Sequence, residues 1–261
     1  MGAETGISWT DSTWNPITGC SKISAGCLNC YASKLSERNL PAVGKLGPDA
    51  ERIYSVAAWN HLPTWSRQAG KAGKIRTVFC ASLADMFEGE HVGTVTYDGL
   101  TWTERRDGPR PGHLEVLLRL AEESPRYPWL RFLMLSKRPW NQRIFAERHG
   151  WPVTWWQGIS TEDQPAYDER LPHVVPGARV FLSVEPMIGP VVIRDPVDWV
   201  VAGSESGPHA RSASIQWFEN LLDQCRTAGI PFHFKQHLVM GKLDKSPLLQ
   251  GAVVQEFPDV L

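Results

Sequence analysis

Three cysteines near the amino terminus are the residues best suited to metal or redox chemistry. Cys20, Cys27 and Cys30 have the spacing C-x6-C-x2-C, whereas Cys80 and Cys225 stand alone in apolar or helical stretches. An odd, clustered set of cysteines in a chain without an export signal argues against a disulfide framework and favours a metal or redox site. We therefore expect the three clustered cysteines to ligate one metal centre, and the two isolated cysteines to take no part in it.

Two kinds of metal centre fit three thiolates on a loop. They can bind three irons of a [4Fe–4S] cluster and leave the fourth iron open for a small ligand. They can also bind Zn²⁺ with a fourth ligand from elsewhere, and a structural zinc is the simpler alternative. The spacing leaves both open. A zinc ribbon would more often show a second C-x2-C pair, which this sequence lacks, and no histidine lies near the cysteines in sequence.

The elements that must position this loop alternate between apolar runs and helical patterns. The apolar runs lack strict alternation, as in strands buried on both faces. Such alternation predicts an α/β fold, a partial or full TIM-like (β/α)6-7 barrel, in a single domain over residues 1–261. We expect strands at Ile7–Trp9, Arg76–Ala81, Arg131–Ser136, Thr154–Ile159, Arg179–Val184, Trp199–Ala202 and Pro231–Lys235, and helices at Tyr31–Asn39, His113–Glu123, Trp140–His149 and Ser214–Ala228.

Two inserts interrupt the repeat beside the second predicted strand. Residues 41–75 carry glycine, proline and basic side chains, and residues 88–112 contain Asp98-Gly99 between two β-branched and aromatic stretches, which predicts a β-hairpin. Because the hairpin follows the carboxyl end of its strand, where barrel active sites lie, it is a candidate substrate-handling element. The alternative is a surface hairpin without a role in the chemistry.

Polar residues follow almost every predicted strand, and parallel strands bring their carboxyl ends to one mouth. We expect the cysteine loop to lie at the rim of that mouth. Any one of these residues alone is typical of a helix cap or a surface charge, but the pattern recurs over six consecutive strands. The set comprises Ser82, Asp85, Lys137, Arg138, Ser160, Glu162, Asp163, Glu185, Glu205, Lys235 and Gln236.

Composition limits the classes of function. In 261 residues, 27 basic and 28 acidic side chains leave a net charge of −1, which excludes a strongly cationic nucleic-acid coat protein but not a local basic patch. No apolar run of membrane-spanning length is present, so we expect a cytoplasmic protein without a membrane partner.

The 12 tryptophans have two interpretations. Those inside predicted strands are expected in the core, namely Trp155, Trp156 and Trp199. Those on inserts or at element starts are candidates for stacking on nucleobases, namely Trp59, Trp65, Trp102 and Trp140.

A family resemblance adds to this interpretation. Ile7-Ser8-Trp9-Thr10-Asp11, followed by Trp14-Asn15-Pro16 and the cysteine loop, resembles a phage-associated three-cysteine family that is similar to radical S-adenosylmethionine (SAM) enzymes. The resemblance covers nearly the whole chain, although the insert around Thr94–Gly112 is longer than expected. The other similar segments are Ala81–Phe87, Leu135–Pro139, Gly158–Gln164, Leu182–Pro186, Gly203–Gly207 and Phe234–Gln236.

The resemblance implies a partial TIM-type barrel with a [4Fe–4S] cluster whose open iron binds SAM through its amino and carboxylate groups. Reductive cleavage of SAM would then give a 5′-deoxyadenosyl radical that abstracts hydrogen from a substrate. Two features depart from the common pattern. The usual motif is C-x3-C-x2-C with an aromatic residue before the last cysteine, whereas Asn29 precedes Cys30 here, and no clear Gly-Gly-Glu follows the second strand. These departures affect the expected details of SAM binding more than the expectation that a cluster is bound.

Roles follow for the polar residues at the mouth. We expect Ser82, Lys137, Ser160, Glu162 and Glu185 to bind SAM, Asp85, Trp102 and Gln236 to bind substrate, and Glu205 and Lys235 to act in catalysis. A simple Glu205–Lys235 ion pair that closes the barrel is the alternative for those two.

The expected function is an isomerase or transferase acting on a modified nucleobase, for example a rearrangement in phage thymidine hypermodification. DNA or a nucleotide would be the substrate, and a protein of flavodoxin or ferredoxin type would donate electrons. The first alternative is a zinc-stabilised nucleic-acid-binding or nuclease-accessory protein without redox chemistry. A degenerate barrel that acts only as an interaction partner is the second alternative.

Overall fold

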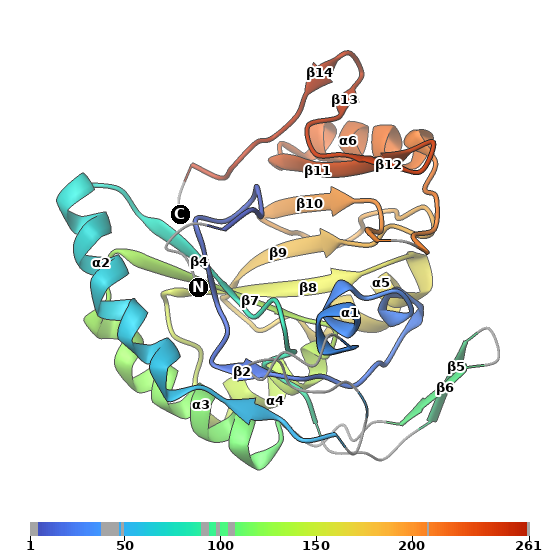
Figure 1. Ribbon diagram of the computed structural model, residues 1–261. Coiled ribbons are helices and arrows are strands. Elements are labelled where there is room, and N and C mark those ends of the chain that lie inside the picture. The colour runs from blue at the N-terminus through green and yellow to red at the C-terminus, as the bar shows by residue number, and fades with distance from the viewer. Residues whose placement is uncertain are drawn as a thin grey trace.

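One curled sheet of eight strands organises the chain (Figure 1). The structure is a computed structural model, and it describes residues 5–37, 47, 50–89, 94–97, 100–103, 108–207 and 209–259. The first seven strands are parallel, and the last is antiparallel to its neighbour. In order across the sheet they are β1 (Ser12–Trp14), β4 (Arg76–Cys80), β7 (Leu130–Ser136), β8 (Trp155–Thr161), β9 (Arg179–Val184), β10 (Trp199–Gly203), β11 (Phe232–Val239) and β12 (Lys242–Asp244).

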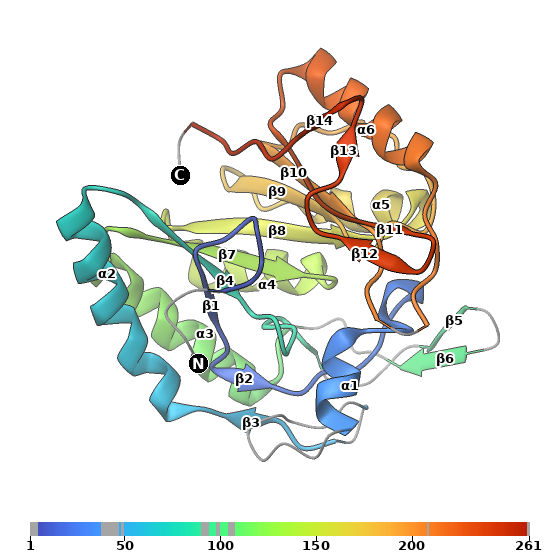
Figure 2. The same ribbon diagram turned by 45° about the horizontal axis from the view of Figure 1, so that its top comes forward.

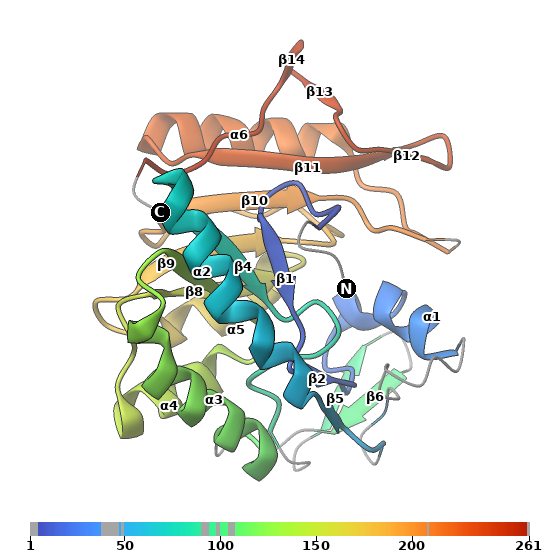
Figure 3. The same cartoon turned by 60° about the vertical axis from the view of Figure 1, so that its left-hand side comes forward.

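Helices cover the outer face of this sheet (Figures 1 and 3). The α/β class and the partial barrel are therefore confirmed, and in the described residues the sheet stays open between β1 and β12. The single domain over residues 1–261 stays a prediction. The helices are α1 (Tyr31–Glu37), α2 (His61–Ala72), α3 (Pro111–Glu123), α4 (Pro139–His149), α5 (Gln164–Arg170) and α6 (Ile215–Ala228), and the short strands outside the sheet are β2 (Ile17–Thr18), β3 (Ile53–Tyr54), β13 (Leu248–Leu249) and β14 (Ala252–Val253).

Local sequence explains several element boundaries. Helix α6 ends at Gly229, whose φ of 68° is left-handed, a conformation that glycine adopts without a steric penalty. Helix α4 begins at Pro139, which tolerates the first helical turn because the amide it lacks has no partner there. The Asp163 side chain caps α5 by accepting from the Ala166 amide at 3.0 Å.

The amino-terminal segment differs from the sequence prediction. Strand β1 covers Ser12–Trp14, so the expected strand at Ile7–Trp9 is wrong. Trp9 instead lies inside the barrel, 1% exposed, with its ring centroid 4.7 Å from that of Phe79. The apolar run therefore fills the barrel interior and does not extend the sheet. Helices α2 and α5 were not predicted from the sequence. Helix α2 contains an internal glycine, which weakens a helical pattern, and α5 has only seven residues, with its proline in the first turn.

Apolar side chains alternate between the two faces of the sheet. Two large clusters fill the outer face, one under α2, α3 and α4 and the other under α6. A third cluster fills the interior at the amino ends of the strands, and it contains Trp9, Phe79, Leu133, Trp156, Phe181, Trp199 and Val201. Side chains further along the same inner face of each strand point toward the mouth of the barrel at the carboxyl ends of the strands.

Most tryptophans belong to the core. Trp155, Trp156 and Trp199 are buried, as expected. Trp59, Trp65 and Trp140 are also buried, at 8%, 3% and 5% exposure, so the prediction that they stack on nucleobases is wrong. Trp59 and Trp65 pack under the outer helices, where large aromatic rings fill the space between helix and sheet.

The predicted β-hairpin is present as β5 (Thr94–Tyr97) and β6 (Leu100–Thr103), which pair in antiparallel register with Tyr97 opposite Leu100. The predicted turn residues, Asp98 and Gly99, lie outside the described residues. Trp102 lies in β6 opposite Val95, and its role in substrate binding stays a prediction. The hairpin extends from the same side of the molecule as the carboxyl ends of the strands (Figures 1 and 2).

The barrel interior leaves no space for a side chain at Gly158 in β8. A Cβ at this position would lie 2.3 Å from the Phe181 ring and 2.8 Å from the backbone of Leu135. Gly158→Ala is therefore expected to lower the free energy of unfolding by about 1–3 kcal/mol through overpacking. Gly6→Ala, where no atom lies within 4 Å, is the matched control, with a change within about 0.5 kcal/mol. Urea denaturation of both variants measures the difference, and equal stabilities would contradict it.

Candidate functional site

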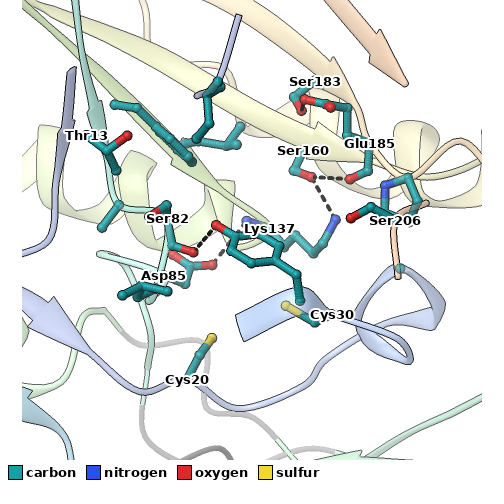
Figure 4. Close-up of a pocket in the computed structure, with 18 of the residues that line it drawn as sticks. Thr13, Cys20, Cys30, Ser82, Asp85, Lys137, Ser160, Ser183, Glu185 and Ser206 are labelled. Carbon is teal, nitrogen blue, oxygen red and sulfur yellow. Dashed lines mark hydrogen bonds between the residues drawn. The ribbon is translucent and has the colours of Figure 1, made fainter. Parts of the chain in front are cut away.

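A cavity of about 620 Å³ opens at the carboxyl ends of the parallel strands. Figure 4 shows Cys20 and Cys30 on one side of it, facing Ser82, Asp85 and Lys137, with Ser160 and Glu185 beyond. The structure thus brings together most of the residues singled out from the sequence. Those that line the cavity are Cys20, Cys27, Cys30, Ser82, Asp85, Lys137, Arg138, Ser160, Glu185, Glu205, Lys235 and Gln236.

The three cysteines border the cavity on the loop between β2 and α1, and all three are half-buried free thiols. Cys80 and Cys225 are fully buried in the two outer clusters, away from the cavity lining. Burial raises the pKa of the Cys20 thiol well above its usual value, and the negative charge of Glu88 adds to this. Burial likewise raises the pKa of Cys30, with Cys27 as the next contributor.

The donor set, three thiols on one loop, is of the type that binds an iron–sulfur cluster or a zinc ion with a fourth ligand. Within the part of the chain that the structure describes, no three side chains of His, Cys, Asp or Glu are gathered closely enough to hold one metal ion. A [4Fe–4S] cluster offers a separate iron to each thiolate, so its ligands need not converge on one point. The three thiols lie on one loop at the edge of a cavity of about 620 Å³, which leaves space for further ligands beside them.

Lys137 carries a positive charge beside the cysteine loop. Its Nζ donates to Ser160 Oγ at 2.7 Å and lies 3.2 Å from Glu162 Oε2. Both partners extend from the end of β8, next to β7 in the sheet. The side chain of Lys137 is 16% exposed, so its ammonium keeps contact with the cavity while it is held in place.

Glu162 lies just behind the cavity wall and is 1% exposed. Its carboxylate pairs with Arg170 of α5 at 2.8 Å and accepts from the Gly26 amide at 3.4 Å. Burial by itself would raise the pKa of this carboxyl, but the charges of Lys137 and Arg170 lower it below the usual range. Contact with SAM stays a prediction for Glu162. Its observed partners are two cations and the cysteine loop.

Two further ion pairs lie on the other side of the mouth. Lys235 Nζ lies 2.7 Å from Glu185 Oε1, and Arg211 Nη2 lies 2.6 Å from Glu205 Oε1. The alternative of a Glu205–Lys235 pair is therefore wrong. Glu185 follows β9 and Lys235 lies on β11, and Gly203 of β10 lies between them. A Cβ on Gly203 would lie 3.1 Å from Glu185 Oε1, so this glycine leaves room for the observed pair.

Asp85 organises the turn that leads from β7 into α4. Its carboxylate accepts from Ser136 Oγ at 2.7 Å and from the Lys137 amide at 3.1 Å, and it pairs with Arg138 at 2.9 Å. Gln236 donates to the Ser204 carbonyl at 2.8 Å. The substrate-binding roles of Asp85 and Gln236 and the catalytic roles of Glu205 and Lys235 stay predictions.

Several residues of the site were not identified from the sequence. Asn15 accepts from the amides of Ser82 and Leu83, and the Tyr31 hydroxyl donates to the Ser82 carbonyl. The remaining ones are charged residues of the ion pairs around the site, namely Arg52, Glu88, Arg170 and Arg211. Asn15 and Tyr31 flank or follow the cysteine motif, a signal that was available. Arg52 and Glu88 are 36 residues apart and leave no local pattern, whereas Arg170 and Arg211 lie eight and six residues after the glutamates that they bind.

Fold and site together define an open parallel α/β barrel with a cysteine loop over the cavity at its carboxyl mouth. The chain matches the family model "Protein of unknown function (DUF5131)" over residues 4–101 and 113–258, and it belongs to this family. The unmatched residues, 102–112, lie within the hairpin insert, which the sequence comparison had already indicated to be long.

Comparison with individual proteins adds little beyond the family. No curated protein matches the chain. Among solved structures, it is similar to a cysteine-to-alanine mutant of spore photoproduct lyase with a dinucleoside spore photoproduct, at 14% identity and a TM-score of 0.43. The match covers 85% of this chain and 55% of that one. No helix in the described residues is long and apolar enough to cross a membrane.

Proposed function

We propose that this chain is a radical SAM-type enzyme that carries a [4Fe–4S] cluster on Cys20, Cys27 and Cys30. One observation carries the proposal: the three-cysteine loop borders a cavity into which the carboxyl ends of parallel strands direct charged and hydroxyl side chains. A structural metal loop has no need of such a cavity, whereas a cluster that binds a small ligand does.

The residues of the cavity suit the two cofactors. When bound, the cluster and SAM would supply one-electron reductive cleavage and hydrogen abstraction from an unactivated C–H bond. The Lys137 ammonium is placed to bind a carboxylate, while Ser82, Ser160 and Glu185 offer hydrogen-bond partners for amino and hydroxyl groups. Lys235 and Gln236 border the same space and are proposed to face the substrate.

The deeper wall of the cavity is apolar. Ile7, Trp9, Phe79 and Leu135 line it beneath the polar mouth. Such a wall excludes water, and exclusion of water limits side reactions of reactive species. This arrangement suits chemistry at a carbon atom that acids and bases do not activate.

We extend the proposal to the substrate class that the sequence resemblance implies, a modified nucleobase in DNA or in a nucleotide, rearranged or substituted at its side chain. A small electron-transfer protein of flavodoxin or ferredoxin type would supply the electron. A base in a duplex would first have to leave the stack, at an unstacking cost of a few kcal/mol.

Anaerobic reconstitution tests the proposal. The purified chain, incubated with iron and sulfide, is expected to turn brown, to bind about four irons per chain and to cleave SAM to 5′-deoxyadenosine once a strong reductant is added. The zinc alternative predicts a colourless protein with one zinc per chain and no SAM cleavage. That second outcome would overturn the enzyme assignment.

The placement of SAM has its own test. Lys137→Met and Glu185→Gln are each expected to weaken SAM binding about tenfold, equivalent to about 1.4 kcal/mol, because each removes a charge that faces the cavity. Calorimetric titration of the reconstituted protein measures the affinity. Lys242→Met, on the exposed end strand β12, is the control and should bind SAM as the wild type does. Unchanged affinity in both cavity variants, with the fold preserved, would reject this placement.

A further inference from the structure

We infer that three carboxylates, each paired with an arginine and each following a different strand, hold the three cysteines in place. Each carboxylate acts through a residue next to one cysteine. The inference rests on the proposed function, because it explains how the cysteine loop is held in position to bind a cluster. The loop has little regular structure of its own, only the single turn of 3-10 helix at Ala25–Cys27. Its geometry therefore depends on contacts from outside the loop.

The first pair holds the residue after Cys20. Ser21 donates its amide to Glu88 Oε1 at 2.9 Å, and its hydroxyl also donates to this carboxylate. Glu88 is in turn held by Arg52 through two contacts of 2.6 Å. From the other side, Arg138 donates to the Ser21 carbonyl at 3.1 Å. Glu88 follows β4 and is fully buried, so Ser21 is tied to the barrel wall.

The second pair holds the residue before Cys27. Gly26 donates its amide to Glu162, which Arg170 binds from behind. A Cβ on Gly26 would lie 3.1 Å from the Glu162 carboxyl and 3.2 Å from Lys137 Nζ. A side chain at this position would crowd Glu162 and Lys137, so glycine lets the loop approach the end of β8 closely without displacing them.

The third pair holds the residue before Cys30. The Asn29 amide donates to Glu205 Oε2 at 3.0 Å, and Arg211 binds the same carboxylate through both its backbone amide and its guanidinium. Arg211 also donates to the Ala25 carbonyl at 2.9 Å, inside the short 3-10 turn. Glu205 follows β10, so this contact joins the loop to a strand end on the other side of the mouth from β4.

Each cysteine thus has a neighbour in sequence that is held by its own carboxylate. Glu162 and Glu205 come from the ends of β8 and β10, and Glu88 comes from the loop after β4, so the three carboxylates are spread across the sheet. Because each of the three neighbouring residues contacts a different carboxylate, loss of one such contact should release its own cysteine more than the other two. The second and third anchors share one link, since Arg211 also binds the Ala25 carbonyl. Glu88, Glu162 and Glu205 are positioning residues in this arrangement, since they act on the cluster only through the loop.

Alkylation of the metal-free chain tests this without any cluster. Ser21→Ala removes the hydroxyl that binds Glu88, and Asn29→Ala removes the side-chain amide that binds Glu205. Gly26→Ala adds a Cβ that crowds Glu162 and Lys137 and moves the loop away from them. All three variants keep the three carboxylates and their arginines. We expect iodoacetamide to modify the adjacent cysteine about tenfold faster in each variant, as measured by peptide mass spectrometry, and the other two by less than about twofold. Asp168→Asn, in an exposed pair with Arg194, is the control and should change none.

A uniform increase at all three cysteines, or no increase in any variant, would overturn the inference. Ser21→Thr keeps the hydroxyl and should restore the wild-type rate at Cys20, which a general loss of packing would not allow. Circular dichroism identifies a variant that has unfolded. For such a variant, the arginine side of the anchor is tested instead: Arg170→Met should release Cys27 alone, and Arg211→Met should release Cys30 and, through the lost bond to the Ala25 carbonyl, Cys27, with Cys20 unchanged in both. If the wild-type chain binds no iron, the proposed function fails, while the alkylation pattern still decides this inference.

Discussion

Replacing Cys20, Cys27 or Cys30 with alanine, one at a time, is expected to reduce SAM cleavage to background. Each thiolate is proposed to bind a different iron, and a cluster that lacks one ligand has an exposed iron that is readily lost. Iron content after reconstitution and the yield of 5′-deoxyadenosine are the two measurements. Both should fall together, because the chain has no spare cysteine at the cavity: Cys80 and Cys225 are buried in the outer clusters.

Cys80→Ala and Cys225→Ala are the matched controls. Both remove a buried sulfur, so a modest loss of stability is expected, of about 1 kcal/mol. Iron content and SAM cleavage should remain at the wild-type level. Loss of iron in either control, or full iron in any of the three loop variants, would contradict the assignment of the ligands.

Glu88→Gln is expected to lower the free energy of unfolding at neutral pH by about 3–5 kcal/mol, because it leaves the buried Arg52 guanidinium without its counter-charge. Glu147→Gln breaks the exposed pair with Arg143 on α4 and is the control, with an effect of at most about 1 kcal/mol. Urea denaturation of the metal-free proteins measures both.

The effect of Glu88 depends on pH in a defined direction. Burial by itself would raise the pKa of its carboxyl, but hydrogen bonds from Arg52 and the charge of Arg138 lower it from 4.5 to about 2. A carboxyl with a lowered pKa in the folded state stabilises the fold above its unfolded value, and this contribution disappears as the pH falls to about 2. The stability difference between wild type and Glu88→Gln should therefore shrink by about 3 kcal/mol between pH 5 and pH 2. A difference that does not change with pH would contradict the assigned ion pairs.

The sheet could be predicted because its strands are continuous apolar runs that end in polar residues. Arg179–Val184 coincides with β9, and β4, β7, β8 and β10 begin or end within two residues of their expected limits. The polar residues after each run could be predicted to meet, because parallel strands place their carboxyl ends at one mouth. The composition of the cavity wall follows from these two regularities.

The ionic partners could not be predicted, since their pairing depends on tertiary structure. Nothing local in the sequence shows that Glu205 binds Arg211 and not Lys235, or that Glu88 lies beside Ser21, 67 positions earlier. The position of Ile7–Trp9 has the same explanation, because a segment of three residues with two apolar side chains fits a strand and a loop that fills the barrel interior equally well. Trp59 and Trp65 were misassigned because α2 itself was not predicted.

The filled amino end of the barrel has a kinetic consequence. In the described residues, Trp9 packs against Phe79, Phe181 and Trp199 beneath the cavity, so molecules come and go on the side of the cysteine loop. A molecule in the deepest position, beside Trp9 and Phe79, then lies behind whatever binds next to the cysteine loop, so it must arrive first and depart last. Turnover should then follow a compulsory order, in which the product near the cysteine loop leaves before the product in the deep position. The product that leaves last should compete for the free enzyme with the reactant that binds first.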